Sequence, residues 1–259
     1  VLIVGGASLD TAGSLTDISQ RALLWDPNTG RFTELASELR IRRAFHTATL
    51  LKAAQPGGPQ RVLLSGGITL ISNERFESTR LAEIFDPETL TFTGQLLEMR
   101  KARYGHTATL LVSGNVLVAG GAELAAGQLI TQDLTVDALQ LDTLHADADV
   151  FQFDEFSPSF AANPVAMASP RVFHVASRGS GGLVLVAGGE DGTLALSSTE
   201  LYSESSGFSG GAELTVARTH ASITRLSGGD LLLMGGLTQA GSLTSATKSN
   251  GIFHSMPYW

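Results

Sequence analysis

The sequence predicts an all-β protein built from repeated four-stranded antiparallel units. Three recurring features of its 259 residues support this prediction: short apolar runs that end in a double glycine, histidines that precede those runs, and paired aromatic residues that follow them. A fixed internal period indicates repeat architecture, because one copy cannot bury its own hydrophobic face without neighbours. We therefore interpret what recurs as scaffold. The double glycines are Gly5-Gly6, Gly66-Gly67, Gly120-Gly121, Gly188-Gly189 and Gly235-Gly236.

The first two strands of a unit are predicted from the histidine motif and the apolar run after it. In one clear copy, Arg43 and His46 lead into Thr-Ala-Thr-Leu-Leu, and the apolar run before Gly66 follows. The fourth copy has Arg218 two rather than three residues before its histidine, which we interpret as drift of a structural repeat. A histidine repeated in every copy is explained by a hydrogen bond or packing contact that each unit needs. The four histidines are His46, His106, His174 and His220.

The third and fourth strands are predicted from two aromatic residues that enclose a polar turn. Two of these turns read Asp26-Pro27-Asn28-Thr29-Gly30 and Asp86-Pro87-Glu88-Thr89, in which proline presets its own φ and asparagine or glycine tolerates positive φ. The third turn departs from this pattern. The expected aromatic pairs are Trp25 with Phe32, Phe85 with Phe92, Phe153 with Phe160, and Tyr202 with Phe208.

These features together resemble the kelch repeat, and the resemblance covers nearly the whole chain. It rests on the Arg-x-x-His opening, the apolar residues before Gly-Gly and the paired aromatics, repeated in a fixed order. The resemblance implies a β-propeller of four-stranded antiparallel blades, with about five blade units in this chain. We expect one domain over residues 1–259. The expected units span 1–40, 41–98, 99–165, 166–214 and 215–259.

The two ends of the chain bear on how such a ring would close. Val1 falls within a second-type strand, and Phe253 and Trp259 have the spacing of an aromatic pair. The innermost strand of the first unit is therefore missing from these residues. We expect a piece of a longer chain, truncated at both ends, with one or two more blades elsewhere.

Composition narrows the function classes. The chain is 43% apolar and 16% charged, with 29 glycines, as expected for one large β domain. No apolar stretch approaches the roughly 18 residues of a membrane span. The net charge of −8 argues against a nucleic-acid surface, which needs clustered lysine and arginine. Without cysteine the chain can form no disulfide and no thiolate site.

The meander topology sorts the loops by face. In a four-stranded antiparallel meander, the second-to-third loops share one face with the connections between units. We expect binding there, because loops on a rigid scaffold carry function. The long loops of this class cover residues 7–20, 68–81, 122–148, 190–198 and 237–249.

The second of these loops has the composition of an interface. It sets Phe76 between Arg75 and Arg80, and arginine and aromatic side chains are favoured anchors at protein interfaces. The alternative is that Phe76 packs against its own unit.

The third loop is acidic and contains no lysine or arginine. Oxygen-rich clusters suit Ca²⁺, so the insertion over 122–149 is a candidate calcium site, which His145 could join. The spacing matches no calcium-loop motif. We therefore favour a solvated acidic loop or an extra hairpin, with no metal or other cofactor. The acidic residues are Glu123, Asp133, Asp137, Asp142, Asp147 and Asp149.

No catalytic residue is assigned. The chain contains neither a Gly-x-Ser-x-Gly turn nor a phosphate-binding Gly-Lys-Ser/Thr loop. We expect a non-catalytic interaction or scaffold module whose partners are other protein chains or a surface glycan. The alternative is a carbohydrate-active or glycan-binding propeller, for example one like a sugar mutarotase. The resemblance, with the alanine, arginine and glycine richness, also implies a bacterial protein of the periplasm, cell surface or extracellular space.

Overall fold

The structure is a computed structural model, and it confirms the all-β prediction. Among the described residues there is no helix, and all paired strands are antiparallel. No helix in this part of the chain could therefore cross a membrane. The described residues are 1–11, 15–53, 58, 60–72, 75–125, 128–129, 141–154, 156–240 and 250–253.

Five main sheets follow one another along the chain. In the second, third and fourth, the strands lie side by side in chain order, as a meander requires. The first sheet contains β1 (Leu2–Val4), β4 (Ala22–Asp26) and β5 (Arg31–Glu34). The second contains β6 (Thr47–Leu51), β7 (Arg61–Ser65), β10 (Leu81–Asp86), β11 (Thr91–Phe92) and β12 (Leu97–Glu98). The third contains β13 (Thr107–Leu110), β14 (Val116–Ala119), β18 (Asp147–Gln152), β19 (Ser159–Phe160) and β20 (Val165–Ala166).

The later sheets and three smaller ones complete the described strands. The fourth sheet contains β21 (Val175–Arg178), β22 (Val184–Ala187), β23 (Thr199–Ser203) and β24 (Gly207–Gly210), and the fifth contains β25 (Ser222–Arg225), β26 (Leu231–Met234) and β27 (Asn250–Phe253). The smaller sheets are β2 (Ala7–Leu9) with β3 (Leu15–Ile18), β8 (Ile68–Ser72) with β9 (Arg75–Ser78) and β16 (Gln128–Leu129), and β15 (Ala122–Leu124) with β17 (Leu141–Leu144).

The strands gather into two compact units. Unit 1 comprises residues 1–104, 123–143 and 154–159, and unit 2 comprises residues 105–122, 144–153 and 160–259. Each unit buries its own apolar core, because each sheet covers the face of another sheet in the same unit. The core of unit 1 includes Ala22, Leu35, Leu39, Leu64, Phe85 and Phe92. One core cluster of unit 2 includes Leu111, Leu117, Val184, Val186 and Tyr202, and another includes Leu185, Leu214, Leu231 and Leu233.

The double glycines lie where one sheet meets the opening of the next. Gly188 has φ +64°, a left-handed conformation that glycine adopts without strain, and a Cβ built on it would lie 2.4 Å from the carbonyl oxygen of Arg218. The next residue, Gly189, donates its N–H to that same oxygen at 2.9 Å. Only a residue without a side chain fits so close to a backbone oxygen. Both residues have a positive φ in the other four double glycines as well, which are Gly5-Gly6, Gly66-Gly67, Gly120-Gly121 and Gly235-Gly236.

The third aromatic pair differs from the predicted one. Phe151, not Phe153, packs against Phe160, with ring centroids 5.2 Å apart at 57°. The same distance and angle relate Phe85 to Phe92. Phe151 lies opposite Val116 in the register that Phe85 has opposite Val62, so β18 is the third strand of its sheet. The aromatic spacing misled the prediction because the turn after this strand is two residues longer.

The fourth histidine, His220, lies one position further from its first strand than the other motif histidines do from theirs. Phe45, Phe173 and His220 all have φ values of 53–54°, and each lies two positions before the start of a first strand. His220 therefore occupies the position of Phe45 and Phe173, and Ala221 occupies that of His46 and His174. The ring of His220 stacks on Phe173, with centroids 4.2 Å apart. Its unusual distance from Arg218 is thus a substitution at a fixed position, not drift in spacing.

Candidate functional site

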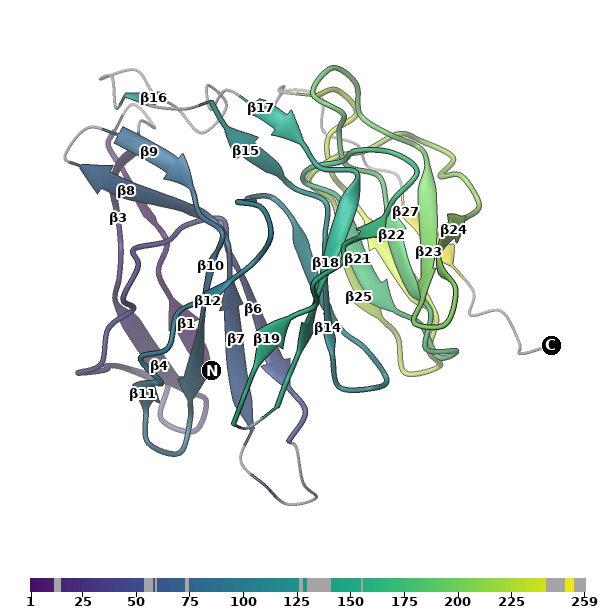
Figure 1. The fold of residues 1–259 in the computed structure, drawn as a ribbon. Coiled ribbons are helices and arrows are strands. Elements are labelled where there is room, and N and C mark those ends of the chain that lie inside the picture. The colour runs from purple at the N-terminus through teal and green to yellow at the C-terminus, as the bar shows by residue number, and fades with distance from the viewer. Residues whose placement is uncertain are drawn as a thin grey trace. The chain divides into compact units, whose positions relative to one another are not determined.

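The long loops of unit 1 are built as β-hairpins. Between β1 and β4 lies the hairpin of β2 and β3, and between β7 and β10 lies the hairpin of β8 and β9. β16 pairs with β9 and extends the second hairpin to three strands (Figure 1). Two aliphatic side chains on these hairpins are more than half exposed: Leu9 at 52% and Ile71 at 54%. The same end of the unit also carries the pocket described next.

A pocket of about 320 Å³ lies between β8–β9 and the segment 40–42 that leads into the second sheet. Its origin can be traced through backbone hydrogen bonds. Ala44 and Ile68 exchange two bonds of 2.8 and 3.0 Å, and no further bridge joins this segment to β8 among the described residues. The segment therefore diverges from β8 after one bonded residue, and the pocket fills the wedge. The pocket is lined by Gln20, Arg40, Ile41, Arg42, Thr69, Leu70, Ile71, Glu77, Thr79 and Leu81.

A buried carboxylate holds the arginine-bearing wall of this pocket. Glu83 on β10 accepts the backbone N–H of Arg40 at 2.8 Å and that of Ile41 at 3.2 Å. The same carboxylate pairs with the guanidinium of Arg43 at 2.7 Å, and both of these side chains are almost wholly buried. Burial lowers the pKa of Arg43, whereas the charge of Glu83 raises it. Glu83 thus ties segment 40–43 to the buried core of unit 1.

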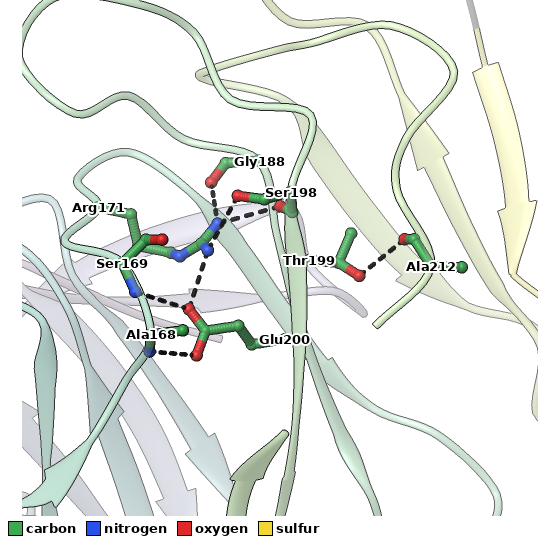
Figure 2. Close-up of polar contacts among 8 residues, drawn as sticks. All are labelled: Ala168, Ser169, Arg171, Gly188, Ser198, Thr199, Glu200 and Ala212. Carbon is green, nitrogen blue, oxygen red and sulfur yellow. Dashed lines mark hydrogen bonds and ion pairs between the residues drawn. The ribbon is translucent and has the colours of Figure 1, made fainter. Parts of the chain in front are cut away.

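The same arrangement recurs in unit 2, where Figure 2 shows it. Glu200 on β23 accepts the N–H groups of Ala168 and Ser169 at 2.8 and 3.4 Å, and pairs with Arg171 at 2.9 Å. Arg171 also donates to the carbonyl oxygens of Gly188 and Ser198. A buried charge persists only when it is paired and hydrogen-bonded in this way. The ion pair is therefore scaffold. The arginines at 40 and 42 have Ala168 and Pro170 as their counterparts in unit 2.

The two pocket arginines are held by different contacts. The guanidinium of Arg42 pairs with Asp17 at 2.9 Å, and both side chains are about half exposed. Arg40 donates a hydrogen bond from its guanidinium to the carbonyl oxygen of Gly94. Sequence reasoning missed both residues, because Arg43 was assigned to the repeat motif and its basic neighbours were not considered. The signal was present in the run Arg40-Ile41-Arg42-Arg43.

The predicted interface loop is only partly available to a partner. Phe76 is fully buried, at 0% exposure, and pairs with Gln128 of β16. Arg75 is exposed on β9. Arg80 makes an exposed salt bridge to Glu98 at 2.8 Å. The interface prediction therefore loses its aromatic anchor. The neighbouring residues Asn73 and Glu74 lie outside the described residues.

The described acidic residues of the third loop do not form one cluster. Asp147 and Asp149 belong to β18, where Asp149 is fully buried in the same register as Glu83 and Glu200. His145 is also fully buried, and its N–H bonds to the carbonyl of Gly121. Asp142 is exposed on β17. The insertion therefore ends earlier than the prediction placed it.

No group of three or more metal-ligating side chains occurs in the part of the chain that the structure describes. Asp133 and Asp137, which belong to the calcium prediction, lie outside that part.

The motif histidines lie beside the double glycines. The Nε2 atom of His174 is 2.9 Å from the hydroxyl of Thr107, and a Cβ on Gly120 would lie 2.7 Å from its ring. A Cβ on Gly5 would lie 3.0 Å from the ring of His46, whose Nδ1 atom is buried without a hydrogen-bond partner among the described residues. His106 is 6% exposed. These positions suit packing contacts between successive sheets.

His46 gives the protein a testable pH dependence. Burial, and to a smaller extent the positive charge of Arg43, lowers the pKa of His46 from 6.5 to about 4. The unfolded chain therefore binds more protons than the folded chain between these two values, so the free energy of unfolding falls as the pH drops through this window. We expect His46 to contribute about 2 to 3 kcal/mol to the loss between pH 7 and pH 4.5. Urea denaturation at both pH values measures it.

The matched variant for this measurement is His46→Gln. It should lose less stability than the wild type over the same pH interval, because carboxylate contributions are common to both proteins. An equal loss in the two proteins would contradict the assignment to His46.

Comparisons with known proteins bear on the fold. No protein-family model matches the chain, and no curated protein matches its sequence. Among solved structures, one described as "Structure of YjhT" matches with a TM-score of 0.68 and 12% sequence identity. The match covers 96% of this chain and 76% of that chain. This likeness shows that the two chains share a fold, and at this identity it shows no more.

Proposed function

We propose that the chain is a kelch-type β-propeller that serves as a non-catalytic protein-interaction module of a secreted or cell-surface bacterial protein. It binds another protein chain through what we call the hairpin surface, made of β2–β3, β8–β9 and residues 40–42. One observation carries the proposal: two exposed aliphatic side chains, Leu9 and Ile71, stand on hairpins beside a pocket that contains two arginines. Arginine is enriched at protein interfaces, and exposed aliphatic side chains beside it add apolar area that a partner can bury.

The repeat architecture supports the propeller part of the proposal. Four of the five double glycines bond to the carbonyl of the arginine that opens the following sheet, as Gly121 does with Arg171 and Gly189 with Arg218. In unit 2 the first strands are neighbours, because β21 contacts both β13 and β25. Repeated sheets whose first strands lie together are expected of propeller blades.

The interaction part is supported by what differs between copies. The ion pair beneath the pocket recurs in unit 2, whereas the arginines do not, because Ala168 and Pro170 replace them. Paired strands occupy the second-to-third loop of the first three sheets, but residues 191–198 of the fourth sheet contain no named strand. Features that a repeat does not need for folding are free to serve binding. The hairpin surface is such a feature.

Peptide-display selection against the folded chain tests the proposal, with a glycan array screened in parallel. Selected peptides should bind the wild type and lose at least tenfold in affinity with Ile71→Asp, because an apolar contact is replaced by a charge. The matched control is Val112→Asp, since Val112 is also an exposed aliphatic residue, at 62%, but precedes β14 in unit 2. That variant should bind like the wild type.

Two results would contradict the proposal. One is the absence of any specific peptide, with glycans bound instead, which would favour the carbohydrate alternative. The other is peptide binding that Ile71→Asp and Val112→Asp affect equally.

A further inference from the structure

We propose that the pocket beside β8 binds an extended acidic peptide that adds to the edge of this strand. The inference rests on the proposed function, and it names the class of partner and the atoms that hold it. A residue of the peptide exchanges two hydrogen bonds with the backbone of Leu70, and a carboxylate of the peptide lies against Arg40 and Arg42.

The backbone of β8 has a free edge at Leu70. Thr79 donates to the carbonyl of Gly67, which makes Gly67 and Thr79 a hydrogen-bonded pair of the hairpin. In an antiparallel ladder such pairs alternate with pairs whose N–H and C=O groups point outward. Ile68 is of the second kind, and its outward groups bond to Ala44. Leu70 lies opposite Phe76, two residues further along the ladder, and the register shifts only between Leu70 and Ser72. Leu70 is therefore the next residue of the second kind, with its N–H and C=O directed toward the pocket.

Residues 40–42 diverge from β8, so they do not pair with this edge of the strand. If residues 40–44 continued alongside β8, Arg42 would lie opposite Leu70, as Ala44 lies opposite Ile68. The bonds from Arg40 and Ile41 to Glu83 draw the segment away instead. Among the described residues no other strand pairs with β8 at Leu70, which lines the pocket. A peptide residue there would repeat at Leu70 the two bonds that Ala44 makes at Ile68, a known mode of recognition.

The arginines that line the pocket favour an acidic peptide. Arg40 and Arg42 lie on the side of the pocket formed by residues 40–42, whereas Glu77 lies on the side formed by β9. A carboxylate on the bound peptide therefore faces the arginines, and arginine binds carboxylates through planar paired hydrogen bonds. The present partner of Arg42, Asp17, is half exposed, and pairs of this kind are weak. A peptide carboxylate can replace it.

The probe for this proposal is the acetylated, amidated peptide Val-Glu-Val-Glu-Val, whose two faces are apolar and acidic when extended. We expect it to bind the wild-type chain, with affinity falling as salt rises. The affinity should fall about fivefold or more with Arg42→Gln. Arg21→Gln is the matched control, because Arg21 is also in an exposed salt bridge of unit 1, to Glu34, but outside the pocket. It should leave the affinity unchanged.

Hydrogen exchange of the Leu70 amide separates strand addition from other modes. Its N–H should exchange more slowly when the probe is bound, and probes N-methylated at single backbone amides in turn should include one that binds at least tenfold more weakly. A bound probe that leaves Leu70 exchange unchanged would overturn the inference, as would equal loss with Arg42→Gln and Arg21→Gln. Display-selected peptides that bind without protecting Leu70 would overturn it while the proposed function stands.

Discussion

Replacement of Glu200 by alanine is expected to lower the free energy of unfolding by about 3 to 5 kcal/mol, because it leaves the buried guanidinium of Arg171 without a counter-charge. The side chains of this ion pair are 0% and 3% exposed, so water cannot take the place of the carboxylate. The variant also removes the acceptor for the N–H groups of Ala168 and Ser169, as Figure 2 shows. Urea denaturation followed by far-UV circular dichroism measures the change.

The matched control for this prediction is an exposed ion pair of similar length. Arg80 and Glu98 are 2.8 Å apart, with side chains 54% and 57% exposed. We expect Glu98→Ala to change the free energy of unfolding by less than about 1 kcal/mol. If Glu200→Ala were as mild as Glu98→Ala, the buried ion pair would not be the scaffold element described above.

Gly188→Ala is expected to destabilise the protein by about 3 kcal/mol or more. Its left-handed φ alone penalises alanine by about 1 to 2 kcal/mol. The new Cβ would also lie 2.4 Å from the carbonyl oxygen of Arg218, a backbone atom that can move only if the next sheet moves. Backbone strain and overpacking are among the few mechanisms that produce effects of this size. The same urea denaturation measures it.

Gly30→Ala separates the two contributions. Gly30 has nearly the same φ, +67°, but a Cβ built there meets nothing within 4 Å. Only the penalty from φ should remain, about 1 to 2 kcal/mol. Equal destabilisation by the two variants would show that the approach of Arg218 contributes nothing.

The sequence predicted the repeating part of this structure well. The double glycines, the apolar runs before them and the turn sequences are local signals, each within about ten residues, and the second, third and fourth sheets follow the predicted strand order. The predictions failed where a copy departs from the pattern. Phe153 was paired in place of Phe151 because the spacing of the turn was taken as constant, and His220 was aligned by residue type rather than by backbone conformation.

The pocket could not be predicted because it depends on contacts between distant residues. Glu83 lies 43 residues from Arg40, and no local pattern connects them. The divergence of residues 40–42 from β8 follows from the bonds of Arg40 and Ile41 to this carboxylate. Arg75, Phe76 and Arg80 were chosen by composition, which could not reveal that strand alternation turns Phe76 inward. By contrast, the arginine run at 40–43 was visible in the sequence, and it became meaningful only once its place beside β8 was known.

The arginine that opens each sheet also constrains how this chain can be recombined. Arg171 accepts a bond from Gly121 of the preceding sheet and donates to Gly188 and Glu200 of its own. A chimera that exchanges a span from one arginine to the next therefore keeps Arg43 with Glu83 and Arg171 with Glu200. A crossover between Arg171 and Glu200 would instead join an arginine to a foreign carboxylate, such as the shorter aspartate at 149. Laboratory shuffling of these repeats should yield folded proteins at the first kind of junction more often than at the second.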